Sequence, residues 1–248
     1  MGYKNYTIRG KTDGFGCQYN AILSGIAFCA NSNGRYRYIH TPFSRVSHGW
    51  ESRTKELSDF IGIPDNRHGK KIHVGQRYNK AVHLDRSPSN WYNKEVLDLI
   101  KSHYWSTEKP EKIQDEIVVH IRRGDVQPHR GGDRKARYMK NKWYNGRIPW
   151  LADRYPDHYK ITIHSEGDMS EFQSIMDGWP EEVKSRTTWK LNACLKEAFN
   201  DMVTAKVFFQ SKSGLSYTAG ILSDGEVYFK MGSSARGQKY PLQNWIVI

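Results

Sequence analysis

The chain has 248 residues, of which 38% are hydrophobic and 13% aromatic. This composition is typical of a globular protein with a full buried core, and it excludes an intrinsically disordered chain. The 38 Lys and Arg residues exceed the 26 Asp and Glu residues and give a net charge of +12. Such an excess indicates an anionic partner, for which a nucleotide diphosphate, a nucleic acid and an anionic surface all qualify.

The sequence contains no sign of a membrane segment. No apolar stretch approaches the roughly 20 residues that span a bilayer, and the polar start lacks the apolar core of a signal peptide. Its three cysteines, Cys17, Cys29 and Cys194, are odd in number and widely spaced, which favours reduced thiols over disulfides. We therefore expect a cytoplasmic protein without a membrane span.

The first half of the chain has an irregular pattern. Its expected elements, in chain order, are a strand at 3–9, a glycine-rich turn at 10–16, a helix at 17–30, a strand at 35–40 and a helix at 91–105. Residues 41–81 contain several glycines and prolines and have no clear assignment. The polar connector 106–116 is the expected boundary between two domains, 1–110 and 111–248.

The second half alternates between strands and helices. The expected strands lie at 117–122, 160–165, 206–211 and 226–230, and the expected helices at 139–154, 168–179, 191–205 and 215–222. Strands separated by helices indicate βαβ units and a mostly parallel sheet. The predicted fold class is therefore α/β.

The strongest local signal is Ile117–Val126, IVVHIRRGDV, an apolar run that ends in Arg122, Arg123 and Asp125. In open α/β sheets the ligand lies beyond the carboxyl ends of the strands, so both arginines are expected to open onto a cleft. Two adjacent guanidiniums suit a diphosphate, because each can hold two phosphate oxygens in a planar fork. The alternative is a surface Arg–Asp cluster that only caps the strand.

A second candidate is the turn between the first strand and the first helix, where Gly14 and Gly16 stand close together. Bare backbone amides at a helix N-terminus can approach an anion or a sugar. A plain tight turn explains the same residues.

A third candidate lies between the strand at 206–211 and the helix that follows it. Lys212, Ser213, Gly214 and Ser216 stand at this junction, where hydroxyls, amides and an ammonium can bind a phosphate. Capping of the helix by Ser213 or Ser216 is the structural alternative.

One pair of carboxylates imitates a metal-binding motif. Glu166 and Asp168 have the acid-x-acid spacing with which some glycosyltransferases hold a divalent cation. Asp168 and Glu171 also have the spacing of a helix capping box, which is the stronger expectation. No zinc motif occurs, and we predict no metal site.

The segment His120–Asp125 resembles the His-x-Arg-Arg-x-Asp motif of the fucosyltransferase superfamily, which includes α1,2-, α1,6- and protein O-fucosyltransferases. Asp13–Tyr19 is similar to the Gly-x-Gly loop near the N-terminus of that family. Ala205–Gly220 is similar to its late strand and Ser-rich phosphate loop. The three segments follow one another in the order of the family and span most of the chain.

The resemblance implies a GT-B-like fold of two facing Rossmann-like domains. The N-terminal domain would serve the acceptor and the C-terminal domain the nucleotide sugar. The implied reaction is a metal-independent transfer with inversion, from GDP-fucose to a glycan or glycoprotein. Chains of this compact type are also similar to glycosyltransferases of large algal viruses, for which UDP-xylose becomes a credible donor and the host cytoplasm the location.

The resemblance also implies residue roles. Arg122 and Arg123 would hold the β-phosphate of the donor and stabilise the departing diphosphate. The other implied donor-binding residues are His120, Asp125, Lys212, Ser213, Gly214, Ser216, Gly14 and Gly16. A base must take the proton of the acceptor hydroxyl, and the candidates are Asp13 and Asp133.

A different class of function also fits the net charge. A non-catalytic nucleic-acid-binding protein would use basic residues together with aromatics such as Trp143 and Tyr144. No known nucleic-acid motif occurs in the chain, so we expect no nucleic-acid partner. The sequence does not indicate an oligomeric state.

Overall fold

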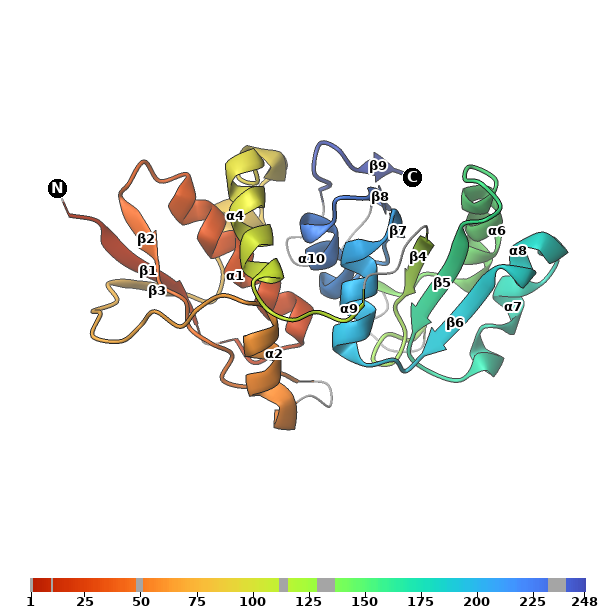
Figure 1. Ribbon diagram of the computed structural model, residues 1–248, viewed down its shortest axis with the longest axis horizontal. Coiled ribbons are helices and arrows are strands. Elements are labelled where there is room, and N and C mark those ends of the chain that lie inside the picture. The colour runs from red at the N-terminus through yellow and green to blue at the C-terminus, as the bar shows by residue number, and fades with distance from the viewer. Residues whose placement is uncertain (1, 10, 48–50, 112–115, 129–136, 232–239) are drawn as a thin grey trace. The chain divides into compact units, whose positions relative to one another are not determined.

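The computed structural model describes residues 2–9, 11–47, 51–111, 116–128, 137–231 and 240–248. The chain forms two compact units (Figure 1). Unit 1 runs to Lys109 and also contains residues 240–244, whereas unit 2 begins at Pro110 and also contains Trp245–Ile248. Each unit has its own sheet, and every strand pair in both sheets is parallel. The predicted α/β class is confirmed.

Unit 1 is built on a three-stranded sheet of order β2-β1-β3. Its elements are β1 (Lys4–Ile8), α1 (Phe15–Ala30), β2 (Tyr36–Tyr38), the 3₁₀ helix η1 (Glu51–Arg53), α2 (Thr54–Phe60), β3 (Val74–Gln76), α3 (Lys80–His83), η2 (Pro88–Asn90) and α4 (Lys94–Trp105). Asn93 caps α4 by accepting a hydrogen bond from the Val96 amide at 3.0 Å. This cap explains why the helix begins later than the expected residue 91.

Unit 2 is built on a six-stranded sheet of order β6-β5-β4-β7-β8-β9. Its elements are β4 (Glu116–Ile121), α6 (Asn141–Ala152), β5 (Lys160–Ser165), η3 (Met169–Glu171), α7 (Gln173–Met176), α8 (Glu181–Ser185), β6 (Thr187–Leu191), α9 (Leu195–Thr204), β7 (Val207–Phe209), α10 (Gly214–Leu222), β8 (Glu226–Phe229) and β9 (Ile246–Val247). Numbered from β4, this is the 3-2-1-4-5-6 order of doubly wound nucleotide-binding sheets.

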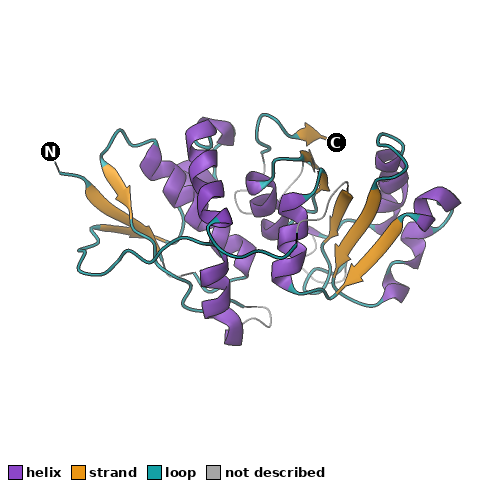
Figure 2. Ribbon diagram, viewed as in Figure 1, coloured by secondary structure: helices purple, strands orange, loops and turns teal. Residues whose placement is uncertain are grey.

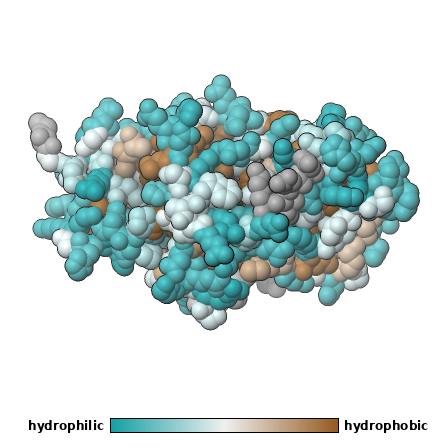
Figure 3. All heavy atoms as spheres, viewed as in Figure 1, coloured by the Kyte–Doolittle hydropathy of each residue, from teal (hydrophilic) through white to brown (hydrophobic). Residues whose placement is uncertain are grey.

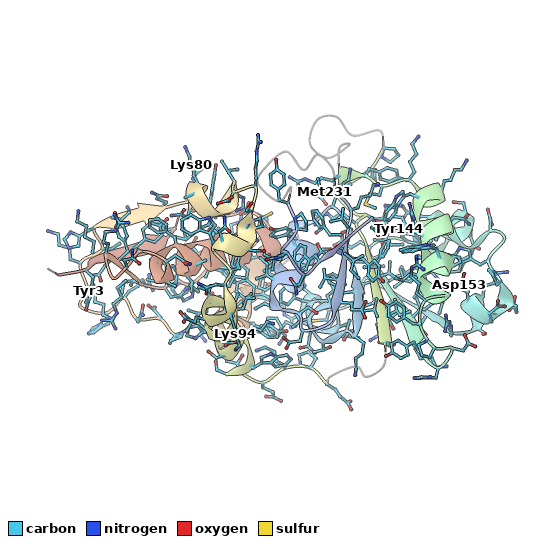
Figure 4. All side chains as sticks on the ribbon, turned by 90° about the horizontal axis from the view of Figure 1, so that it is seen from above. Tyr3, Lys80, Lys94, Tyr144, Asp153 and Met231 are labelled. Atoms are coloured by element: carbon cyan, nitrogen blue, oxygen red, sulfur yellow. The ribbon has the colours of Figure 1, made fainter. Side chains whose placement is uncertain are left out.

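Helices cover both faces of the sheet in unit 2. Figures 1 and 2 show α6, α7 and α8 on one face and α9 and α10 on the other. A parallel strand that is buried on both faces needs apolar side chains at successive positions, and Ile117, Val118 and Val119 of β4 are at most 1% exposed. On the α6 face, Ile117 and Val119 pack in one cluster with Tyr144, which Figure 4 labels.

Two helices expected in unit 2 are present with different bounds. The helix expected at 191–205 starts only at Leu195, because Leu191 ends the unpredicted strand β6. Asn192 separates the two with a φ of 56°, a left-handed conformation that Asn tolerates better than most residues. The helix expected at 168–179 is broken into η3 and α7 and ends at Met176. Gly178, with a φ of 72°, turns the chain soon afterwards.

The structure also shows which elements lie in residues 41–81, to which the sequence pattern assigned none. Residues 41–81 contain α2, the third strand β3 and the start of α3, all of them short. Among the described residues, no helix is long and apolar enough to cross a membrane. Hydrophilic side chains cover most of the face drawn in Figure 3, and apolar atoms form small groups between them.

Gly62 fixes the packing of α2 against α4. It follows α2 with a φ of 71°, and its amide donates to the Asp59 carbonyl at 3.1 Å. A Cβ at this position would lie 1.8 Å from the carbonyl oxygen of His103 on α4. Gly34 has a similar φ of 74° and open space around it, so the two glycines differ in their surroundings rather than in their backbone conformation.

We expect Gly62→Ala to destabilise the protein more than Gly34→Ala. The left-handed conformation costs both variants about 1–2 kcal/mol, whereas only Gly62→Ala also forces a backbone carbonyl of α4 to move. The free energy of unfolding in urea, measured for both variants and the parent chain, checks this difference. Equal losses in the two variants would contradict the close packing of α2 on α4.

Candidate functional site

The candidate site lies at the carboxyl ends of β4 and β7. These strands pair in parallel from Ile117 opposite Val207 to Val119 opposite Phe209. The strand order reverses between them, and in such sheets the chain leaves the two strands toward opposite faces and opens a crevice at their ends. The two following loops meet here, because Arg122 Nη1 lies 3.3 Å from Ser213 Oγ.

The protein contacts of Arg122 fix its side chain but do not use all of its hydrogen-bond donors. Its Nη2 donates to Asp125 Oδ1 at 2.6 Å, and the two side chains are 20% and 23% exposed. Its Nε is buried and has no partner among the described residues. A buried charged donor without a partner is costly, and an anionic ligand supplies the missing acceptor.

Arg123 occupies a different environment. It is 3% exposed and donates to the carbonyls of Arg122 and Met139 and to Asn141 Oδ1, at 2.5–3.1 Å. Its guanidinium also lies 4.4 Å from the centre of the Tyr138 ring. These contacts leave it anchoring the loop after β4, so the geometry favours a positioning role over the phosphate contact expected from the sequence.

His120 ties β4 to the turn after β7. Its Nδ1 is hydrogen-bonded to Ser216 Oγ and lies 3.1 Å from Ser211 Oγ, and the two hydroxyls are also 3.1 Å apart. Burial, the charge of Arg122 and that of His164 lower the pKa of His120 to about 3. The imidazole is therefore neutral near pH 7 and joins the strands through hydrogen bonds rather than through charge.

The serine-rich turn both caps a helix and faces Arg122. Ser213 Oγ accepts a hydrogen bond from the Leu215 amide at 3.1 Å, so the capping alternative is confirmed for this residue. Gly214 is the first residue of α10 and is buried, as is Ser216. The N-terminus of α10 carries a partial positive charge, which adds to that of Arg122.

Two lysines extend the positive charge along the carboxyl ends of the strands, which form the basic edge of the unit 2 sheet. Lys212 follows β7 and Lys230 follows β8, the next strand of the sheet. Burial lowers the pKa of Lys212, and the nearby charge of Lys230 lowers it further. Lys230 was not predicted as a site residue, although its place at the end of a strand is the same signal that identified Arg122. One cation thus follows each of three adjacent strands.

Gly124 is required by the turn of the arginine motif. Its φ is 67°, and a Cβ there would lie 2.0 Å from Glu166 Oε2. The other acid of the metal-like pair, Asp168, forms the expected capping box with Glu171, whose side chain accepts from the Asp168 amide at 3.1 Å. Among the described residues, no three His, Cys, Asp or Glu side chains are grouped to hold a metal ion.

The remaining predicted site residues lie in unit 1 or outside the residues that the structure describes. Asp13 is half exposed, and its carboxylate lies 3.1 Å from Lys11 Nζ. Gly14 is the N-cap of α1 and Gly16 is buried in its first turn. Asp133, the other candidate base, lies outside the described residues.

The chain is similar to known proteins in its fold alone. No family model and no curated protein sequence matches the chain. Among solved structures, it is similar to the ADP-heptose lipopolysaccharide heptosyltransferase II of E. coli, with a TM-score of 0.43 and 12% identity over 99% of this chain and 90% of the other. It is also similar to a family 9 glycosyltransferase from Veillonella parvula DSM 2008, with a TM-score of 0.40 and 14% identity over 93% and 69%. Neither likeness identifies a family or a substrate.

The burial of His120 predicts a pH-dependent stability. Because its folded pKa of about 3 lies below the unfolded value of about 6.5, the unfolded state binds the proton first as the pH falls. The contribution of His120 to the free energy of unfolding is complete above pH 6.5. It is lost as the pH falls toward 3, at up to about 1.4 kcal/mol per pH unit.

We expect the stability of His120→Asn to fall less steeply than that of the parent chain between about pH 6 and pH 4, because Asn does not titrate. Urea unfolding at several pH values measures both slopes, and His68→Asn, at an exposed position, is the matched control. If the His120→Asn and parent curves run parallel, His120 is not buried in its neutral form.

Proposed function

We propose that this chain is a glycosyltransferase that uses a nucleotide-sugar donor without a metal ion. The observation that supports the proposal is Arg122, whose Nε has no partner in the described part of the chain and lies at the strand-order reversal beside Ser213 and the N-terminus of α10. A basic edge of this kind suits the diphosphate of a sugar donor. Unit 2 would bind the donor and unit 1 the acceptor.

The proposed reaction breaks the bond between the anomeric carbon and the β-phosphate oxygen, whose electrons stay with the departing diphosphate. The acceptor oxygen forms the new bond on the opposite face and gives its proton to a base, for which Asp13 and Asp133 remain the candidates. Negative charge grows on the β-phosphate during this step. In this proposal, Arg122, Lys212 and the amides at the start of α10 would stabilise this charge more in the transition state than in the ground state.

The choice of donor rests on the sequence. The motif His120–Asp125 favours fucose transfer from GDP-fucose, to a glycan or glycoprotein. The similarity to compact viral enzymes favours a UDP-sugar such as UDP-xylose and action in a host cytoplasm. Both donors place the same diphosphate on Arg122, so the geometry of the charged edge supports either.

The two aromatic residues named for nucleic-acid binding, Trp143 and Tyr144, do not support that alternative. Tyr144 is 1% exposed, and Trp143 packs against the core of unit 2 with Lys230 Nζ 5.1 Å from the centre of its ring. Base stacking needs an accessible aromatic face. These two side chains serve the fold instead.

We expect Arg122→Ala to lower the turnover of sugar transfer by at least about a hundredfold, because it removes a donor that acts on the growing phosphate charge. Arg122→Lys should restore little, since an ammonium cannot reproduce the planar fork. Arg154→Ala, which removes an exposed arginine from the turn that follows α6, is the control and should keep full activity. The initial rate with a radiolabelled donor measures all three, and parent-like transfer by Arg122→Ala would refute the site.

Transfer should also survive chelation, because the proposal neutralises the diphosphate with side chains and amides rather than with a cation. The measurement is the rate in excess EDTA after dialysis. Loss of activity that is restored by Mn²⁺ or Mg²⁺ would show that a metal does this work and would exclude the metal-independent mechanism.

A further inference from the structure

The sheet of unit 1 has one apolar face and one basic face. α1 packs against β1 and β2, and Tyr6 and Ile8 of β1 lie in the core cluster on that side (Figure 1). Because side chains alternate along a strand, the residues next to these two point to the opposite face. Arg9 follows β1 directly, Arg37 is the middle residue of β2, and Arg77 follows β3. All three side chains are exposed.

Contacts and register place these cations on the face that turns away from α1. Arg37 stands opposite Asn5 in the register of β1 and β2. The side chain of Arg9 extends over Gly75 of β3, where a Cβ would lie 2.7 Å from Arg9 Nε. The carbonyl of the exposed Lys71 accepts a hydrogen bond from Asn5 Nδ2 at 2.6 Å, so the loop before β3 returns along the same face. The basic sheet face consists of Arg9, Arg37, Lys71 and Arg77.

No carboxylate balances the basic sheet face. Residues 2–9, 35–40 and 66–80 contain nine Lys and Arg residues and no Asp or Glu. The acids that flank these ranges, Asp13 and Asp65, are paired with Lys11 and Arg67 at 3.1 and 2.7 Å. Within the described part of the chain, none of the four cations of the face forms an ion pair. Like charges without counter-charges repel one another, and an anionic partner removes that repulsion.

The side chains of this face suit phosphate groups at an interface with lipid. Three of the four cations are arginines, whose planar guanidinium can hold two phosphate oxygens. Arg37 Nη1 donates to the hydroxyl of Tyr3 at 2.8 Å, and its guanidinium lies 5.4 Å from the centre of the Tyr3 ring. Tyr3, which Figure 4 labels, is 54% exposed. A tyrosine with an apolar ring and a polar tip is typical of the boundary between a membrane and water.

A lipid surface fits this face better than a nucleic acid does. A nucleic acid carries its phosphates at a fixed spacing, whereas anionic lipids diffuse and can gather under cations that three strand segments and a loop present. Stacking of bases also requires free aromatic faces. Among the described residues of this face, the one aromatic side chain is Tyr3, and its ring is already covered on one side by Arg37.

We propose that the basic sheet face docks unit 1 on an anionic lipid surface, with its guanidiniums on the headgroup phosphates and Tyr3 at the interface. Attraction between exposed charges falls off within a Debye length, so the docking is reversible and weakens with salt. It is a peripheral contact made by surface side chains. The inference goes beyond the proposed transferase activity, because neither donor binding nor sugar transfer requires it.

Co-sedimentation of the full chain with lipid vesicles tests the proposal. We expect binding to vesicles of phosphatidylcholine mixed with phosphatidylserine, no binding to phosphatidylcholine alone, and loss of binding when the salt rises from about 0.1 M to about 0.5 M. The variant Arg9→Gln/Arg37→Gln/Arg77→Gln should bind the anionic vesicles at least about tenfold more weakly, because each cation near the surface contributes to the attraction.

The matched control is Arg154→Gln/Lys160→Gln/Lys184→Gln, which removes the same charge from exposed positions of unit 2 and should bind as the parent chain does. Absence of binding to anionic vesicles, equal binding to neutral ones, or equal losses in the two triple variants would overturn the proposal. Tighter binding to an oligonucleotide, lost in the first variant, would overturn it in favour of a nucleic acid.

The vesicle and salt comparisons use the parent chain, so they decide the question even if the first triple variant does not fold. A titration of the same samples with GDP and UDP reports on unit 2. Vesicle binding without nucleotide binding would support the docking surface and count against the transferase, and the reverse result would do the opposite.

Discussion

The parallel pairing of β4 with β7 is the interaction on which the chemistry of unit 2 depends. It joins the first and fourth strands of the sheet, where the chain order reverses, and so brings residues 91 positions apart within 3.3 Å at Arg122 and Ser213. The hydrogen bonds of His120 to the serine-rich turn reinforce the same junction. A fold with these strands apart would contain the same residues without a common site.

The two arginines of one motif perform different tasks because neighbouring residues of an extended chain point to opposite sides. Arg122 faces the α10 turn and has one donor without a partner among the residues that the structure describes, whereas Arg123 is enclosed by Tyr138, Met139 and Asn141. Gly124 then turns the chain with a positive φ under Glu166. Arg123 thus fixes the backbone of the loop by donating to the Arg122 carbonyl, whereas Asp125 holds the partly exposed Arg122 guanidinium.

The sequence predicted those parts of the molecule that follow from local patterns. β5 was predicted with its observed bounds, and β4 and α10 within one residue, because apolar runs and a serine cap mark them directly. β6 was missed, since its residues TTWKL are polar enough to lie at a half-buried edge and carry no strand alternation. The same holds for the candidate site. Arg122 and Ser213 could be predicted because they follow strands, whereas the burial of Arg123 depends on tertiary packing and could not.

A cavity beside His40 in unit 1 lay beyond sequence reasoning for a similar reason. Its lining comes mostly from residues 40–65, where short elements alternate with turns and no period extends far enough to assign. A lone histidine after a strand is a weak pattern, and the burial of both its ring nitrogens, without partners in the described part of the chain, depends on tertiary packing. Such features become visible only when the hydrogen-bond partners of buried polar atoms are identified in the folded structure.

We propose above that the basic edge after β4, β7 and β8 binds the phosphates of a nucleotide. Calorimetric titration of the parent chain with GDP and UDP, and with guanosine and uridine, measures this phosphate contribution. Since hydrogen bonds to charged groups contribute about 1.5–3 kcal/mol each, we expect a diphosphate to bind at least about tenfold more tightly than its nucleoside, with a smaller difference at high salt. A nucleoside that binds as tightly as its diphosphate would show that this edge does not bind phosphate.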